Sequence, residues 1–164
     1  MDEVTVRRAT REELPQLAKL ASLLVQVHHD TDPGRFFMPD RVEEGYAWWF
    51  GRELENPKAV ILAALDEGVV VGYSYGTLDE RDFNQLLDRH GSIHDVFVSN
   101  SKRRGQIGRR LMEAMISELE ALGAPRVVLH TMVSNTAAQA LFRSVGFRDT
   151  MLEMTRGPLP APER

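Results

Sequence analysis

Apolar residues in the first half of the chain recur in two different periods. A period of two predicts strands, and a period of three to four predicts helices. Thr10 with Glu13, and Asp40 with Glu43, have the spacing of a capping box and indicate two helix starts. The elements predicted for this half are a strand at 4–7, a helix over 14–25, a loop at 29–39 and a helix over 40–55.

The second half opens on two apolar runs, 60–65 and 69–75, joined by a short turn that contains Gly68. This arrangement predicts a β-hairpin. Further along, Gly123 and Gly146 are plausible helix ends. The elements predicted after the hairpin are a polar loop at 79–91, a strand at 93–98, a helix over 107–122, a strand at 127–129, a helix over 135–145 and a last strand at 147–154.

The order of predicted elements is β-α-α-β-β-β-α-β-α-β. A hairpin gives antiparallel neighbours and a strand–helix–strand unit gives parallel ones. We therefore predict the α/β class, of the α+β type with a mixed sheet. The 164 residues suffice for one domain with a buried core. We expect this domain to span 1–156, followed by a Pro-rich tail at 157–164.

Composition narrows the class of protein. Twenty Lys and Arg against 24 Asp and Glu give a net charge of −4, which disfavours nucleic-acid binding because such domains usually carry a basic surface. The lack of cysteine excludes disulfides, thiolate metal sites and cysteine nucleophiles. No apolar run approaches the ~18 residues of a membrane span, and the start of the sequence has no signal-peptide pattern. We expect a cytoplasmic protein.

A cationic stretch at 101–115 lies between a predicted strand and a predicted helix. The N-terminus of a helix binds phosphate oxygens readily, and Gly105 and Gly108 would let a ligand approach the backbone. Three interpretations stay open at this point: the phosphates of a small cofactor, a nucleic-acid backbone, or a solvated basic turn. The cationic residues are Lys102, Arg103, Arg104, Arg109 and Arg110.

A second motif, SNTAAQALFRSVGF at 134–147, favours the first of these interpretations, the phosphates of a small cofactor. Together with the basic stretch it resembles the GNAT superfamily of N-acetyltransferases, closest in motif pattern to members that act on small amines or diamines. In that family, Gln/Arg-x-x-Gly-x-Gly/Ala at a helix start is followed by Asn-x-x-Ala, an aromatic residue and Gly-Phe. The matching positions are Arg103, Gly108, Asn135, Ala138, Phe142, Gly146 and Phe147.

The resemblance implies a fold and a cosubstrate. The family's sheet is mostly antiparallel and splayed at its fourth and fifth strands, and IHDVFV looks like the fourth strand. Acetyl-CoA would pair its pantetheine arm with the backbone of that strand and place its pyrophosphate at the following helix start. The residues that the resemblance assigns to acetyl-CoA are Val96, Phe97, Val98, Arg103, Arg104, Gly105, Gln106, Ile107, Gly108, Arg109, Asn135, Thr136, Ala137, Ala138 and Phe142.

Two positions depart from the family pattern. Gln106 replaces the central glycine, so its amide must point away from the pyrophosphate or hydrogen-bond to it. Phe142 replaces a tyrosine with which many members protonate the departing thiolate, and a phenyl ring cannot donate a proton. A thiol pKa near ~8.5 makes thiolate a tolerable leaving group, and Tyr73, Tyr75 or water are the alternative donors.

His94 is the candidate catalytic base. An alkylamine titrates near ~10, so a proton must be removed before the nitrogen can attack. Imidazole suits this task, and the resemblance places a base on the fourth strand. Asp95 should face the opposite side of a regular strand. His28 and His29 are not predicted to bind a metal, because adjacent helical residues face different ways and no third ligand is evident.

The predicted function is transfer of an acetyl group from acetyl-CoA to a primary amine, on a small molecule or a peptide, by direct attack. A catalytically weak acyl-CoA-binding or sensing module is the alternative that Phe142 favours, and nucleic-acid binding through 102–110 is a weaker one. We expect no metal, nucleic-acid or membrane partner. An exposed final strand would be an edge that needs cover, so we expect a homodimer.

Overall fold

The computed structural model describes residues 4–102 and 106–158 of the chain. Its strands are β1 (Thr5–Arg8), β2 (Ala59–Asp66), β3 (Val69–Asp79), β4 (His90–Val98) and β5 (Val127–Leu129). Its helices are α1 (Leu14–Thr31), α2 (Val42–Glu53), α3 (Ile107–Ala121) and α4 (Thr136–Ser144), with short 3-10 turns at Arg11–Glu13 and Asn100–Lys102.

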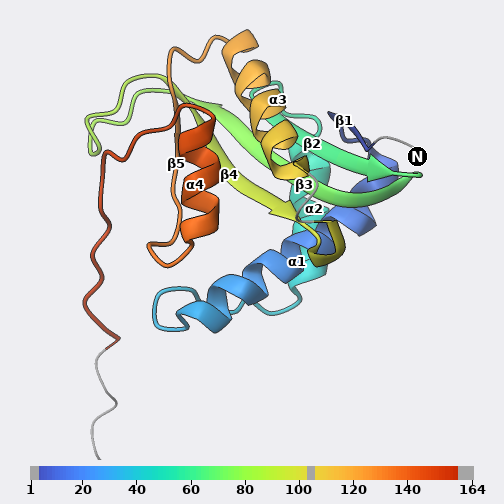
Figure 1. Ribbon diagram of the computed structural model, residues 1–164, viewed down its shortest axis with the longest axis horizontal. Helices are drawn as coiled ribbons and strands as arrows, with labels where there is room; N and C mark the ends of the chain where they lie inside the picture. Colours follow the sequence, from blue (N-terminus) through green and yellow to red (C-terminus); the bar gives the residue numbers. More distant parts are fainter. Residues whose placement is uncertain (1–3, 103–105, 159–164) are drawn as a thin grey trace, which may run out of the picture.

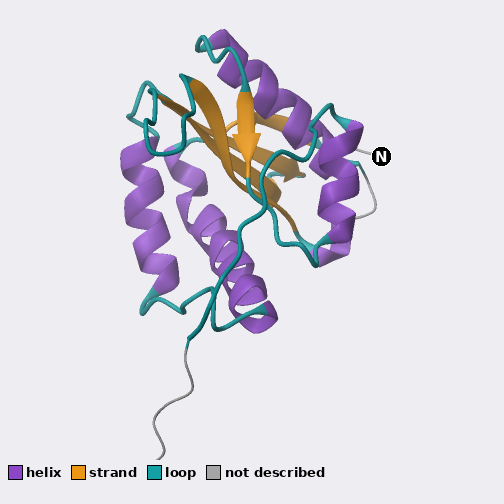
Figure 2. Ribbon diagram, turned by 90° about the vertical axis from the view of Figure 1, so that its left-hand side faces the viewer, coloured by secondary structure: helices purple, strands orange, loops and turns teal. Residues whose placement is uncertain are grey.

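The five strands form one sheet in the order β1-β2-β3-β4-β5. Neighbours from β1 to β4 are antiparallel, and β5 runs parallel to β4. Helices cover both faces of this sheet, with α1 and α2 on one side and α3 and α4 on the other (Figures 1 and 2). The predicted class, with its mixed and mostly antiparallel sheet, is confirmed.

The core is double-sided because β2 is apolar on both faces. Ile61 and Ala63 pack in the cluster under α1 and α2, whereas Val60 and Leu62 pack in the cluster under α3. All four side chains are almost fully buried. A strand covered on both faces reads as a continuous apolar run rather than an alternating one, which is the pattern of 60–65.

An extra residue interrupts β4 opposite β3. Tyr75 pairs with Asp95 and the next residue, Gly76, pairs with Ile93, so His94 has no partner in the register. Such a β-bulge reverses the alternation of side chains beyond it. Accordingly Ile93 packs in the cluster under α3, whereas Phe97, four residues later, packs in the cluster under α1 and α2.

Several predicted boundaries differ from the structure. Strand β3 runs to Asp79 rather than 75, and β4 begins at His90 rather than 93, so both enter the predicted loop at 79–91. Helix α1 continues to Thr31, through part of the predicted loop at 29–39. The predicted cap of α2 at Asp40 is wrong, because Arg41 occupies the N-cap position in a left-handed conformation with φ 53°. The predicted last strand at 147–154 is also wrong, since residues 147–158 form no helix or strand. This segment leaves the top of α4 and descends outside it (Figure 1).

Helix α3 begins after Gln106, whose φ of 59° and ψ of 10° are also left-handed. A non-glycine residue in this region carries a steric cost of about 1–2 kcal/mol. Gln106 is the residue that replaces the motif's central glycine, so the backbone keeps a glycine-like conformation although the side chain has changed.

We expect Gln106→Gly to raise the free energy of unfolding by about 1 kcal/mol. The change removes the left-handed cost of about 1–2 kcal/mol and adds unfolded-state entropy that costs about 0.4–1 kcal/mol. Urea denaturation measures the difference. Gln106→Ala is the control and should gain nothing, since alanine retains the steric cost. A glycine variant less stable than the alanine variant would contradict the left-handed conformation.

Candidate active site

A pocket of about 480 Å³ lies between the start of α2 and the bulge in β4. Because the bulge leaves consecutive residues on one face of the sheet, His94 and Asp95 both line it. The prediction that Asp95 points away from the cleft held only for a regular strand, and it is wrong here. The lining residues are Pro39, Asp40, Arg41, Val42, Gly45, Tyr46, Trp49, Tyr75, His94 and Asp95.

His94 is exposed and is oriented by a short polar chain. Its Nε2 lies 2.8 Å from Oγ1 of Thr77, and this hydroxyl donates to Oδ1 of Asp79 at 2.9 Å. A hydroxyl has a single proton, so with Asp79 accepting it the oxygen of Thr77 accepts from Nε2–H. The tautomer assigned by this network leaves Nδ1 as the ring nitrogen able to accept a proton.

Asp95 is a half-buried carboxylate that accepts a hydrogen bond from a buried tyrosine. Its Oδ2 accepts a hydrogen bond of 3.0 Å from the hydroxyl of Tyr73, a residue with no exposed surface. Burial raises the pKa of Asp95, because water no longer stabilises the ionised form, whereas Tyr73, His94 and His28 act in the opposite direction. The pocket thus contains a carboxyl group whose negative charge is only partly compensated.

Two carboxylates contribute to the raised pKa values of the tyrosines that line the pocket. Burial and the nearby charge of Asp95 raise the pKa of Tyr46 to about 12. The hydroxyl of Tyr75 donates to Oε2 of Glu53 at 2.6 Å, and burial followed by this bond raises the Tyr75 pKa. The hydroxyls of Tyr73 and Tyr75, considered above as proton donors, are therefore both bonded to carboxylates.

The strand β4 extends well beyond its pairing with β5. The two strands pair only from Gly91 with Val127 to Ile93 with Leu129. The strand then continues through Val96, Phe97 and Val98, the residues assigned to the pantetheine arm. The predicted splay of the fourth and fifth strands is consistent with this early end of the ladder.

The start of α3 carries the remaining residues assigned to the pyrophosphate. Ile107 is buried, and a Cβ added to Gly108 would lie 3.2 Å from Cδ2 of Leu141. Gly108 therefore also allows α3 and α4 to pack closely, a role that the sequence did not indicate. Arg103, Arg104 and Gly105 lie outside the described residues.

The described cations of the basic stretch have protein partners. Nε of Arg109 donates to Glu113 at 2.8 Å, and Nζ of Lys102 lies 2.6 Å from Oδ2 of Asp66. Arg110 donates to the carbonyl oxygen of Val4 at 2.6 Å. Within 106–110 the structure thus provides the helix N-terminus for an anion, with both guanidinium groups engaged elsewhere.

Helix α4 carries the second motif. The side chain of Asn135 accepts from the backbone N–H of Ala138 at 3.1 Å, so Asn135 is an N-cap, with Thr136 and Ala137 in the first turn. Phe142 is half-buried, and its ring centroid lies 6.3 Å from that of Phe147. This packing explains an aromatic residue at 142 without any need for a hydroxyl.

Sequence reasoning missed several residues of the pocket. Thr77 and Glu53 had no motif, and the segment 39–42 was assigned to a loop and a helix start. Trp48 and Phe37 are 61% and 78% exposed, whereas Trp49 lines the pocket. An aromatic pair on the helix facing the fourth strand was the available signal.

Neither a membrane span nor a metal centre is found in the part of the chain that the structure describes. None of its helices is long and apolar enough to cross a bilayer. None of its His, Asp and Glu residues gather in a group of three or more suited to a metal ion. His28 and His29 instead use Nδ1 at 2.8 Å from the carbonyl oxygens of Leu24 and Phe36.

The sequence matches the Acetyltransferase (GNAT) family over residues 23–147. IAA acetyltransferase of Azospirillum brasilense is 34% identical over 105 residues, which are 64% of this chain and 61% of that protein. The ribosomal protein bS18-alanine N-acetyltransferase of Escherichia coli (strain K12) is 31% identical over 74 residues, 45% of this chain and 50% of that protein. The chain thus spans between half and two thirds of these relatives.

A solved structure extends the comparison to the fold. AAC(6')-Iy in complex with the bisubstrate analog CoA-S-monomethyl-acetylneamine superposes with a TM-score of 0.73. The match covers 96% of this chain and 99% of that chain, at 16% sequence identity. At this identity the likeness concerns the fold alone.

We expect Asp95→Asn to stabilise the folded chain at pH 7 by about 0.5–2 kcal/mol, in the range of other changes that relieve a strained functional site. The raised pKa means that ionised Asp95 opposes folding above its folded-state pKa. The gain should shrink as pH falls through that pKa, because the native carboxyl becomes neutral. Thermal denaturation between pH 4 and 8 measures it.

Asp88→Asn is the matched control for this change. Arg81 lowers the pKa of exposed Asp88 to about 2, so its ionised form favours folding above the unfolded-state pKa. The control should therefore gain no stability at pH 7. If the Asp95→Asn variant had a lower melting temperature than the wild type at pH 7, the charge of Asp95 would not be only partly compensated.

Proposed function

The chain belongs to the Acetyltransferase (GNAT) family, with acetyl-CoA as cosubstrate, and from this premise we propose that it is an N-acetyltransferase acting on a primary amine. The observation that carries the proposal is the bulge in β4, which turns His94 and Asp95 into the same pocket. One group can attract a cationic amine while the other removes its proton.

Asp95 is the group suited to attract the amine. An alkylamine with a pKa near ~10 is an ammonium ion at neutral pH, and a cation supplies the charge that this half-buried carboxyl lacks. The rings of Tyr46 and Trp49 line the same pocket and favour a cation over their faces. A pocket of about 480 Å³ has room for a small amine or for the end of a peptide.

His94 is the group suited to take the proton. The bond to Thr77 places the proton of the neutral ring on Nε2, so Nδ1 accepts the proton that the ammonium loses. Acetyl-CoA, when bound, supplies the acetyl thioester that the free amine attacks. Asp79 and Thr77 keep the imidazole in one tautomer, in the way that an orienting carboxylate does in other base dyads.

The cofactor-binding residues of this proposal are those of β4 and of the two helix starts. Val96, Phe97 and Val98 lie on β4 beyond its last residue paired with β5, next to the place where the resemblance puts the pantetheine arm, and the N-terminus of α3 after Gln106 offers backbone N–H groups for phosphate oxygens. The described cations are engaged elsewhere, so within this part the backbone carries the recognition. Arg103, Arg104 and Gly105 stay predictions, as does the cytoplasmic location.

The proposal predicts that acetyl-CoA binds at micromolar strength and duplex DNA does not. Isothermal titration calorimetry with each ligand measures this. A panel of small amines and N-terminal peptides, assayed by release of free CoA, then identifies the acceptor. Heat from DNA without heat from acetyl-CoA would overturn the proposal. Tight acetyl-CoA binding without turnover of any amine would favour the binding-module alternative instead.

His94→Ala should lower kcat/KM at pH 7 by about 10²–10⁴, the usual effect of removing a general base. The dependence of log kcat/KM on pH should also change in this variant, because the group that takes the proton is gone. Thr77→Val should produce a smaller loss of about tenfold, since the ring remains but its tautomer is no longer held, and Thr77→Ser should restore the rate. A pH profile unaffected by His94→Ala would assign the proton to water.

A further inference from the structure

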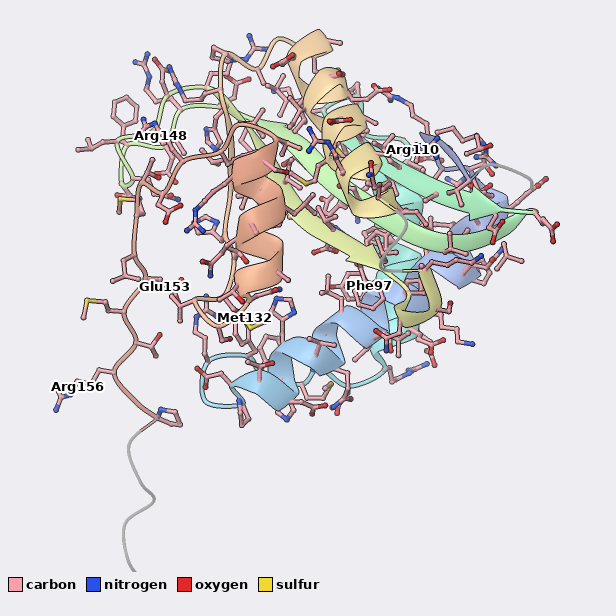
Figure 3. All side chains as sticks on the ribbon, in the orientation of Figure 1. Phe97, Arg110, Met132, Arg148, Glu153 and Arg156 are labelled. Atoms are coloured by element: carbon pink, nitrogen blue, oxygen red, sulfur yellow. The ribbon has the colours of Figure 1, made fainter. Side chains whose placement is uncertain are left out.

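A group of polar side chains lies behind the candidate base, on the face of β3 and β4 that also carries the pocket. In the register of these strands Thr77 lies opposite Ser92, and Asp79 lies opposite His90. Residues two apart on a strand face the same side, so these four side chains form two adjacent cross-strand pairs. Figure 3 shows Phe97 near the end of β4, and the polar group belongs to the opposite end of this strand, next to the loop that follows β3.

Asp79 is the centre of this group, because both of its carboxylate oxygens have a donor. Oδ1 accepts from the hydroxyl of Thr77 at 2.9 Å, and the same hydroxyl oxygen lies 2.8 Å from Nε2 of His94. Oδ2 accepts from the hydroxyl of Ser92 at 2.6 Å. Since Ser92 binds the second oxygen, it fixes the direction in which the first oxygen faces Thr77.

His90 packs beside the same carboxylate and is almost fully buried. Its Nδ1 lies 2.8 Å from the carbonyl oxygen of Asp88, an atom that can only accept, so Nδ1 carries a hydrogen and the ring is held in place. Nε2 then lies 3.7 Å from Oδ2 of Asp79, which is a packing distance rather than a hydrogen bond. The buried ring therefore restricts the room in which the carboxylate can turn.

The orientation of Asp79 decides where the hydroxyl hydrogen of Thr77 points. This hydroxyl has one hydrogen and two neighbouring acceptors, the carboxylate of Asp79 and Nε2 of His94. With Asp79 in place the hydroxyl donates to the charged group, the stronger bond, and Nε2 keeps its own hydrogen. With Asp79 turned away the hydroxyl would donate to Nε2. The hydrogen of the neutral ring would then lie on Nδ1, which could no longer accept a proton from an amine.

We propose that Ser92 is a further positioning residue for the reaction and acts on His94 through Asp79 and Thr77, with the ring of His90 as the wall that keeps Asp79 in place. The inference rests on the proposed function, in which Nδ1 of His94 takes the proton. Neither Ser92 nor His90 lines the pocket, so both act at a distance from the acceptor amine. Their role is to hold the base in its proton-accepting tautomer.

The first test detects the tautomer of His94 and needs neither acetyl-CoA nor an amine. Long-range ¹H–¹⁵N NMR of the protein labelled at its histidines distinguishes the ring nitrogen that carries a hydrogen from the one that does not. His94→Gln identifies the signals of this ring among the five histidines. At a pH where the ring is neutral, the wild type should carry the hydrogen on Nε2.

Ser92→Ala should raise the population of the Nδ1–H form about three- to tenfold, the ratio that one net hydrogen bond supports. Ser92→Thr keeps the hydroxyl on a residue that suits a strand, and it should restore the wild-type spectrum. A merely structural serine would change the melting temperature and leave the tautomer unchanged. Equal spectra for the wild type and Ser92→Ala would overturn the proposal.

His29→Ala is the matched control for His90→Ala. Nδ1 of His29 also lies 2.8 Å from a backbone carbonyl oxygen, that of Phe36, but His29 belongs to α1 and not to the polar group of β3 and β4. His90→Ala should shift the tautomer of His94 in the same direction as Ser92→Ala, and His29→Ala should not. An unchanged spectrum in His90→Ala, or an equal shift in His29→Ala, would overturn the part assigned to His90.

The second test relates the tautomer to catalysis, with an amine that the CoA-release panel identifies. Ser92→Ala should lower kcat about three- to tenfold, as for the loss of one net hydrogen bond, and leave KM unchanged because Ser92 does not line the pocket. In a Thr77→Val background the same change should have no further effect, since the connection to His94 is already broken. Additive losses in the double variant would overturn the proposal.

The two readouts separate failure of this inference from failure of the proposed function. A lowered kcat in Ser92→Ala with an unchanged tautomer would overturn the positioning role and leave His94 as the base. A shifted tautomer with an unchanged kcat would support the positioning of His94 by Ser92, and it would overturn the assignment of His94 as the base.

Discussion

One extra residue in β4 places His94 and Asp95 in the same pocket. Without it, His94 and Asp95 would face opposite sides of the sheet, and one of them would enter the cluster under α3, where an uncompensated polar group is costly. With it, both side chains enter the pocket, and Phe97 returns to the cluster under α1 and α2. The buried clusters on the two faces fix this register, because a slip by one residue would exchange every side chain of β4 between them.

Two features of the pocket lower the stability of the folded protein. A half-buried carboxyl with one tyrosine donor, and an arginine in a left-handed conformation at the start of α2, are both unfavourable for the empty protein. The double-sided core of β2 and α3 offsets these costs. Functional sites commonly contain a charged group that its surroundings compensate only in part. Asp95 is such a group in this pocket.

The sequence allowed the sheet class, most elements and the family to be predicted, because each depends on a local period or a short spacing. The bulge was not predicted from the pattern of β4, because IHDVFV has two polar residues followed by three apolar ones and no alternation that fixes which face each side chain takes. Thr77 and Glu53 were missed because their roles depend on partners 17 and 22 residues away, Thr77 with His94 and Glu53 with Tyr75. The last strand failed for another reason. Its residues have strand propensity, but a strand also needs a neighbour, and within the described chain residues 147–154 pair with no other strand.

The shortness of β5 has two consequences for this sheet. Because β5 spans only Val127–Leu129, β4 continues beyond it, and the part of β4 assigned to the pantetheine arm follows where the ladder ends. The same short strand is also the edge of the sheet, so its outer side is open to a further strand. A longer β5 would extend the ladder along β4 towards the residues assigned to the pantetheine arm, and it would lengthen this edge of the sheet. The length of one three-residue strand therefore sets both how far β4 is paired with it and how long this edge of the described sheet is.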